Sequence, residues 1–191
     1  MTQKSWSEGR WLNPPAFSEI KDGSLYVTSE EGADFWRETA YGFTHESGHA
    51  LLYDFPKESS VEVTFKVNYD FQFDQAGLII WSDKTQYVKA GVEFADGKPQ
   101  LGAVVTNTKS DWSIAPVPEW MNNYVTVRAS RSGDALTVRA KCEGDWQLVR
   151  LAPLDPARIW QAGILVSSTN RGGLVVEFTR LEMGQPDSTL H

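Results

Sequence analysis

Apolar and polar residues alternate along most of the chain. Between residues 61 and 69, Val, Val, Phe, Val and Tyr alternate with Glu, Thr, Lys and Asn, which is typical of a strand with one buried face. Residues 124–130 and 135–141 repeat the pattern, and the Arg-Ser-Gly-Asp segment between them predicts a hairpin turn. The dipeptide Asp96-Gly97 predicts another hairpin.

The same pattern predicts further strands at residues 24–28, 50–55, 76–81, 86–94, 101–107, 147–151, 162–167 and 174–181. No segment has the 3.6-residue period of an amphipathic helix, although residues 154–160 could form one short helical turn. About a dozen strands joined by hairpins predict an all-β sandwich of two sheets. We expect one domain over residues 1–191, with loosely held ends at residues 1–12 and 185–191.

Composition and charge narrow the class of protein. The 191 residues include a single cysteine, Cys142, so an intramolecular disulfide is excluded and a reducing compartment is favoured. The net charge is −7 and there is no Lys/Arg run, which argues against binding nucleic acid or an anionic membrane. Neither a signal peptide nor an apolar run of about 18 residues is found, so we expect a cytoplasmic protein.

One predicted strand has an unusual polar face. In residues 86–94, Tyr87, Lys89, Gly91 and Glu93 share a face, opposite a purely apolar one. Lys89 and Glu93 lie roughly 13 Å apart along the strand at about 3.3 Å per residue, so they could bracket a ligand lying over Gly91. The alternative is a solvent-facing strand with ordinary charges. Arg128, on the polar face of another strand, could hold a polyhydroxylated or carboxylated ligand or be a plain surface residue.

Four segments of the chain form a recognisable set. They are Phe-Trp-Arg-Glu-Thr at 35–39, Asp-Gln-Ala-Gly-Leu-Ile-Ile-Trp at 74–81, Lys-Ala-Gly-Val-Glu-Phe at 89–94 and Ser-Asp-Trp-Ser at 110–113. Together they resemble a family of concanavalin A-like domains of unknown function whose fungal members are called regulation-of-enolase proteins. The resemblance covers about residues 11–181 and implies a concanavalin A-like jelly-roll sandwich of two curved antiparallel sheets. Proteins with this fold include lectins, laminarinase-like glycosidases and carbohydrate-binding modules, so a carbohydrate ligand is an expectation by analogy.

Glycosidase motifs are weak in this chain. A retaining enzyme of the laminarinase kind needs two carboxylates about 5–5.5 Å apart, and the nearest match, residues 143–147, has Gln in place of the second Glu and is expected to be a turn. An inverting pair, with carboxyl groups about 6.5–9.5 Å apart, could combine Glu93 with Asp111 or Asp74. His45 is the best candidate for a general base.

Metal and cofactor sites are not expected. His45 and His49 have the spacing of a zinc-binding helix, but the intervening Glu-Ser-Gly favours a turn between strands. Asn68, Asp70 and Asp74 give only a faint calcium signal. There is no P-loop and no Gly-x-Gly-x-x-Gly motif, which argues against a nucleotide cofactor.

The eight tryptophans supply candidate stacking platforms for a sugar ring. Trp36, Trp81 and Trp112 each stand beside polar residues, although a core position is the alternative for each of them. Trp120 could rim the site, whereas Trp146 and Trp160 are expected to be structural.

Three hypotheses for function follow from the sequence. The first is a module that binds a carbohydrate or another small polar metabolite; its candidate residues are Trp36, Trp81, Tyr87, Lys89, Glu93, Asp111, Trp112 and Arg128. The second is an enzyme, a glycosidase-like hydrolase or a lyase acting on a sugar derivative, with Glu93 as acid or base and His45 assisting. The third is a regulatory protein partner in carbohydrate metabolism. A Glu93 pKa far from the ordinary value would favour the enzyme.

Overall fold

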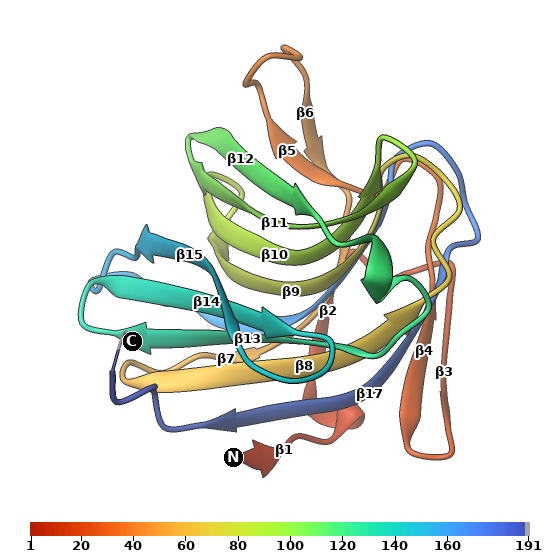
Figure 1. Cartoon of the computed structure of the whole chain (residues 1–191). Coiled ribbons are helices and arrows are strands. Elements are labelled where there is room, and N and C mark those ends of the chain that lie inside the picture. Colours follow the sequence, from red (N-terminus) through yellow and green to blue (C-terminus); the bar gives the residue numbers. More distant parts are fainter. Residues whose placement is uncertain (190–191) are drawn as a thin grey trace.

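The computed structural model describes residues 1–189 and consists of two antiparallel sheets packed face to face (Figure 1). The eight-stranded sheet contains β1 (Thr2–Gln3), β3 (Phe17–Lys21), β4 (Ser24–Thr28), β8 (Ser59–Val67), β13 (Val125–Ser132), β14 (Ala135–Lys141), β15 (Gln147–Pro153) and β17 (Val175–Gly184). Its order is β15–β14–β13–β8–β17–β4–β3, and β1 also pairs with β17.

The seven-stranded sheet contains β2 (Arg10–Leu12), β7 (His49–Asp54), β9 (Asp74–Asp83), β10 (Gln86–Ala95), β11 (Lys98–Asn107), β12 (Lys109–Pro116) and β16 (Gln161–Ser168). Its order is β12–β11–β10–β9–β16–β7–β2. A separate hairpin of β5 (Phe35–Arg37) and β6 (Thr44–Glu46) stands over this sheet, on the side away from the other one (Figure 1). The prediction of an all-β, two-sheet sandwich is therefore confirmed.

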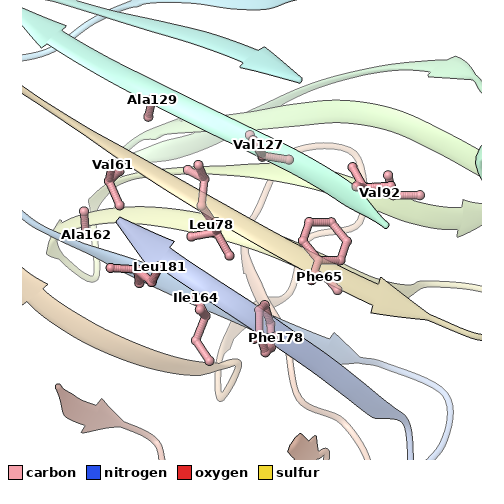
Figure 2. Close-up of a cluster of buried hydrophobic side chains, with 14 of the residues drawn as sticks. Val61, Phe65, Leu78, Val92, Val127, Ala129, Ala162, Ile164, Phe178 and Leu181 are labelled. Carbon is pink, nitrogen blue, oxygen red and sulfur yellow. The ribbon is translucent and has the colours of Figure 1, made fainter. Parts of the chain in front are cut away.

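The core lies between the inner faces of the two sheets. Figure 2 shows Leu78 and Ile164 from one sheet near Phe65, Val127 and Phe178 from the other, and none of them is more than 1% exposed. These residues occupy the apolar positions of the alternating pattern, so burial of one strand face accounts for the register. A fully buried side chain of this size contributes about 1.5–3 kcal/mol to folding.

Both chain ends differ from the prediction of loose segments. Trp6 lies in a short 3-10 helix, η1 (Trp6–Glu8), is only 8% exposed, and donates from Nε1 to the Gly23 carbonyl oxygen at 2.9 Å. At the other end, Asp187 is held by two arginines of the eight-stranded sheet. Residues 190 and 191, the last part of that prediction, lie outside the described residues.

The remaining local differences concern short elements. Residues 154–160 form a turn and no helix, and a 3-10 helix, η2 (Pro118–Trp120), is found elsewhere. The alternating pattern missed β1, β2, β3, β5, β6 and β12, which are short or exposed. Within residues 1–189 no helix has the length and apolarity needed to cross a membrane.

Three glycines in register shape the outer face of the seven-stranded sheet. Gly102, Gly91 and Gly77 are directly opposite one another on β11, β10 and β9, and we refer to them as the glycine row. A Cβ atom on Gly91 would overlap the Ala76 carbonyl oxygen, and one on Gly77 would overlap that of Ala90. The row therefore leaves a strip of bare backbone between the side chains on either side of it.

Part of this outer face is covered by the chain itself. Phe35, at the start of β5, packs against Trp81 and Tyr87 with ring centroids 5.3 and 5.8 Å away, and all three belong to or pack on a second apolar cluster with Ile79 and Leu165. This cluster seals the sheet over β9, β16 and β7. The apolar cluster leaves the surface over β11, β12 and the rest of β10 uncovered.

We expect Gly91→Ala to lower the free energy of unfolding by about 1–3 kcal/mol, because the added methyl group forces two strands apart. Gly172→Ala is the matched control, since the nearest atom to its Cβ would be 3.4 Å away, and its effect should stay within about 0.5 kcal/mol. Urea denaturation of the two variants measures both values. Equal stabilities of the two variants would contradict the claim that the glycine row has no room for a Cβ atom at Gly91.

Candidate functional site

A cleft of about 340 Å³ lies on the outer face of the seven-stranded sheet, between that sheet and the β5–β6 hairpin. Its size is at the lower end of the range for small-molecule sites. It is lined by Asp34, Trp36, Tyr41, Phe43, His45, Phe73, Gln75, Lys89, Glu93, Val104, Trp112, Thr169 and Asn170. A small niche of about 10 Å³, over Gly91 and Gly102, continues it into the floor.

The floor holds a buried ion pair. Lys89 Nζ lies 2.6 Å from Asp34 Oδ1, and the two side chains are 4% and 16% exposed. The same Asp34 oxygen accepts from the Phe35 backbone N–H at 2.7 Å. Two charges can be buried together because each compensates the other, whereas an isolated one would cost several kcal/mol.

Glu93 lies on the other side of the glycine row and is also buried. Its Oε2 accepts from Gln75 Nε2 at 2.6 Å, and the residue is 8% exposed. Burial raises the pKa of Glu93 to about 7; the Lys89 ammonium lowers it, the Asp34 carboxylate raises it and the hydrogen bond from Gln75 lowers it. Gln75 Oε1 is buried and has no hydrogen-bond partner among the described residues, so the floor keeps a vacant acceptor.

Aromatic side chains form one side of the cleft, which we call the aromatic wall: Trp36, Tyr41, Phe43 and Trp112. Trp36 meets Trp112 edge-on at 6.3 Å and Tyr41 edge-on at 5.6 Å, whereas Tyr41 and Phe43 are stacked at 5.3 Å. Tyr41 and Phe43 are 52% and 44% exposed, so apolar ring surface faces solvent at the mouth of the cleft. Exposed clustered aromatics of this kind mark binding surfaces.

The wall is fastened to the sheet by Arg37. Its backbone N–H donates to Ser110 Oγ and its Nε donates to the Thr108 carbonyl oxygen, both at 2.9 Å, while Nη1 pairs with Glu46 Oε1 at 2.8 Å. On the opposite rim, Arg171 pairs with fully buried Asp74 and joins the loop after β16 to the start of β9. Both rims are therefore anchored to regular strands.

Five of the residues predicted from the sequence meet in this cleft: Trp36, His45, Lys89, Glu93 and Trp112. As expected, Lys89 and Glu93 stand on either side of Gly91. Tyr87 and Trp81 share the sheet face but stack on each other at 5.5 Å beneath Phe35, and neither lines the cleft. Their expected role as ligand platforms is replaced by a role in covering the sheet.

Arg128 and Asp111 lie elsewhere. Arg128 belongs to β13 in the eight-stranded sheet, where it pairs with Asp187 at 2.8 Å and Glu62 at 3.4 Å. Asp111 points away from the cleft and pairs with Arg150 at 3.0 Å. Asp74 forms an ion pair with Arg171. Neither of the two carboxylates suggested as partners of Glu93 in an inverting mechanism therefore faces Glu93.

The other tryptophan and histidine residues considered in the sequence analysis lie outside the cleft. Trp120 is 4% exposed in the main core rather than at the rim, and Trp160 is likewise buried. His49 is buried and accepts from the Glu30 N–H at 3.0 Å, whereas His45 lines the cleft. Among residues 1–189 no group of three or more His, Cys, Asp or Glu could hold a metal ion.

Sequence reasoning missed eight residues that line the cleft: Asp34, Tyr41, Phe43, Phe73, Gln75, Val104, Thr169 and Asn170. Gln75 had a readable signal, because Gln75, Gly77 and Ile79 alternate with the apolar residues of β9. Asp34 and the hairpin residues 41–43 lie in irregular segments, and no local pattern shows which sheet they approach.

Comparison with known proteins gives a family and a fold. The family described as "Protein of unknown function (DUF1349)" matches residues 11–186. "Regulation of enolase protein 1" of Saccharomyces cerevisiae is 34% identical over 181 residues, which cover 94% of this chain and 91% of the relative. The expected resemblance to the family of fungal regulation-of-enolase proteins is confirmed.

Solved structures agree. The crystal structure of a functionally unknown protein from Saccharomyces cerevisiae superposes with a TM-score of 0.91 at 33% identity, covering 97% of this chain and all of that one. Bacteroides ovatus GH43B from a xyloglucan utilisation locus gives 0.77 at 12% identity, with 96% of this chain on 39% of the enzyme. A putative beta-glucanase from Mycobacterium abscessus gives 0.60 at 10% identity and covers 96% and 94%. The concanavalin A-like sandwich is thus confirmed.

The raised pKa of Glu93 predicts a pH-dependent stability. Between its ordinary pKa of 4.5 and about 7, the folded protein holds a proton that the unfolded chain has lost, so this group destabilises the fold progressively as pH rises through that window. Glu93→Gln removes the effect, and the variant should gain roughly 3 kcal/mol over the wild type between pH 4 and pH 8. Denaturant unfolding at both pH values measures it.

Asp111→Asn is the control, because it removes a carboxylate whose side chain is 65% exposed. Its stability relative to the wild type should change little across the same pH range. A Glu93→Gln variant that tracks the wild type at both pH values would contradict the assignment of the pKa.

Proposed function

The chain belongs to the DUF1349 family, and we propose that it binds a carbohydrate or sugar derivative in the cleft over β10, β11 and β12. The convergence of one aromatic wall with buried polar groups on a floor of bare backbone carries this proposal. Sugar rings have an apolar face that stacks on aromatic side chains and a rim of hydroxyls that need hydrogen-bond partners.

The polar floor supplies those partners. Gln75 offers its vacant Oε1 as an acceptor, and Glu93 offers a carboxyl group that either accepts or donates according to its protonation. Lys89 and Asp34 add an ammonium and a carboxylate on the other side of the glycine row. A hydroxylated ring lying over Gly91 would therefore meet polar groups at two of its edges.

The fold likeness to parts of glycoside hydrolases supports the same reading, although at 10–12% identity it concerns architecture alone. The cleft residues of this chain carry the argument for a sugar. Location in the cytoplasm is part of the proposal and rests on the sequence expectations alone.

We expect at least one neutral mono- or oligosaccharide to raise the melting temperature of the purified protein in a thermal-shift screen. A ligand at 100 times its Kd stabilises the fold by about 2.7 kcal/mol, a readily measured shift. Trp112→Ala should abolish the shift by removing a ring of the aromatic wall, and Glu93→Gln should weaken it. Tyr124→Ala, which removes an exposed aromatic ring on the eight-stranded sheet, should leave it intact.

A well-folded protein that responds to no sugar would contradict the proposal, and would favour the alternative of a regulatory protein partner. A shift that survives Trp112→Ala and disappears in Tyr124→Ala would place the sugar at the eight-stranded sheet and contradict the proposed cleft.

The pKa of Glu93 favours a second candidate function, acid–base catalysis on the bound sugar. A carboxyl group with a pKa of about 7 can both give and take a proton at neutral pH, which is the property that efficient acid–base catalysts share. His45, on the opposite hairpin, lines the same cleft and could assist.

If the cleft is catalytic, the sugar that shifts the melting temperature should be converted, and the rate should change through a group of pKa near 7. Glu93→Gln should lower kcat by a factor of about 10² to 10⁴, far more than it weakens binding of the sugar. NMR of the sugar during incubation with each protein measures this. An unchanged sugar after long incubation would leave the cleft as a binding site only.

A further inference from the structure

We propose, resting on the proposed sugar-binding function, that the cleft selects a free amino sugar, a hexose ring that carries a protonated primary amine. The balance of charges in the cleft, the vacant oxygen of Glu93 and the aromatic wall lead to this ligand class by three separate steps.

The cation of the cleft already has a counter-ion. Lys89 is the one Lys or Arg residue among the described residues that lines the cleft, and its Nζ lies 2.6 Å from Asp34 Oδ1. A ligand carboxylate or phosphate would have to displace Asp34 from a buried contact. Anionic sugars are therefore disfavoured.

Glu93 is the acid without a counter-ion. Gln75 donates to its Oε2, and no described residue donates to its Oε1. The groups around it include Lys89, already paired, Asp34 and the buried Tyr69. Burial raises the pKa of the Tyr69 phenol, and the charges of Asp74 and Glu93 raise it further. His45 lines the same cleft. An ammonium that reaches Oε1 would compensate a buried carboxylate, which is costly to leave alone.

The aromatic wall favours the same charge. Trp36, Tyr41, Phe43 and Trp112 present ring surfaces to the cleft, and the negative potential of such faces attracts cations. A hexosamine satisfies both parts of the site at once, because its ring stacks and its amine pairs. A neutral sugar stacks on the wall and hydrogen-bonds to the floor but leaves the Glu93 charge uncompensated, whereas an amine without a ring uses only the charge.

Isothermal titration calorimetry at pH 7 tests the inference with D-glucosamine and D-galactosamine, each compared with its parent hexose and its N-acetyl derivative. At least one free amine should bind tenfold or more tightly than both uncharged counterparts. Since the pKa of Glu93 is about 7, roughly half of the free sites hold a proton that the ammonium must expel. Titrations in buffers of different ionisation enthalpy should therefore show release of up to about half a proton, and none for the parent hexose.

Glu93→Gln should remove the proton release and reduce the preference for the amine to less than threefold, while the parent hexose still binds. Asp111→Asn, a carboxylate outside the cleft, should keep the preference.

The outcomes separate this inference from the proposed function. Hexoses that bind as tightly as their amines would overturn the inference and leave sugar binding standing. Ethanolamine or choline binding as tightly as the hexosamine would overturn sugar recognition and leave a cation site. No binding by any of these probes would overturn the inference, and a thermal-shift screen without a hit would overturn the proposed function as well.

Discussion

The close approach of backbones along the glycine row is the constraint on which the cleft depends. Gly77 and Gly91 face each other so closely that neither position has room for a Cβ atom. On β10 the side chains two residues to either side, Lys89 and Glu93, therefore stand as the walls of a bare strip. Charges that would reach solvent on a flatter sheet are held instead beneath a hairpin and a loop, at 3% and 8% exposure.

Burial of Lys89 and Glu93 determines which partners these two side chains need in the cleft. Lys89 finds a carboxylate because residues 33–37 cross the outer face, and Phe35 fixes that crossing by packing on Tyr87 and Trp81. Burial raises the pKa of Glu93, and the nearby Lys89 ammonium and the hydrogen bond from Gln75 offset that rise only in part. A buried ion pair and a carboxyl group of shifted pKa that line one cleft make this surface a candidate functional site.

The parts of this structure that could be predicted from sequence are those governed by local alternation. Strands β4 and β14 have the predicted bounds, and the shared face of Lys89, Gly91 and Glu93 follows from the period of two alone. Arg128 has an equally clear polar face, but its side of the molecule depends on strand order, since β13 pairs with β8 and β14 in the other sheet. Asp34 reaches Lys89 across 55 positions of the chain, a contact decided by packing.

The pairing of the carboxyl groups in this cleft differs from the one expected for a two-carboxylate glycosidase. Such an enzyme needs one acid and one carboxylate free to act as nucleophile or base. Two carboxyl groups line the cleft among the described residues. Asp34 is bound to Lys89 and the Phe35 N–H, whereas Glu93 is held by the neutral Gln75 amide and has no charged partner. Its neutral-range pKa suits one proton transfer or one charged partner. The sandwich thus shares its architecture with parts of glycoside hydrolases, while its cleft lacks, among the described residues, the second unpaired carboxyl group that a two-carboxylate mechanism needs.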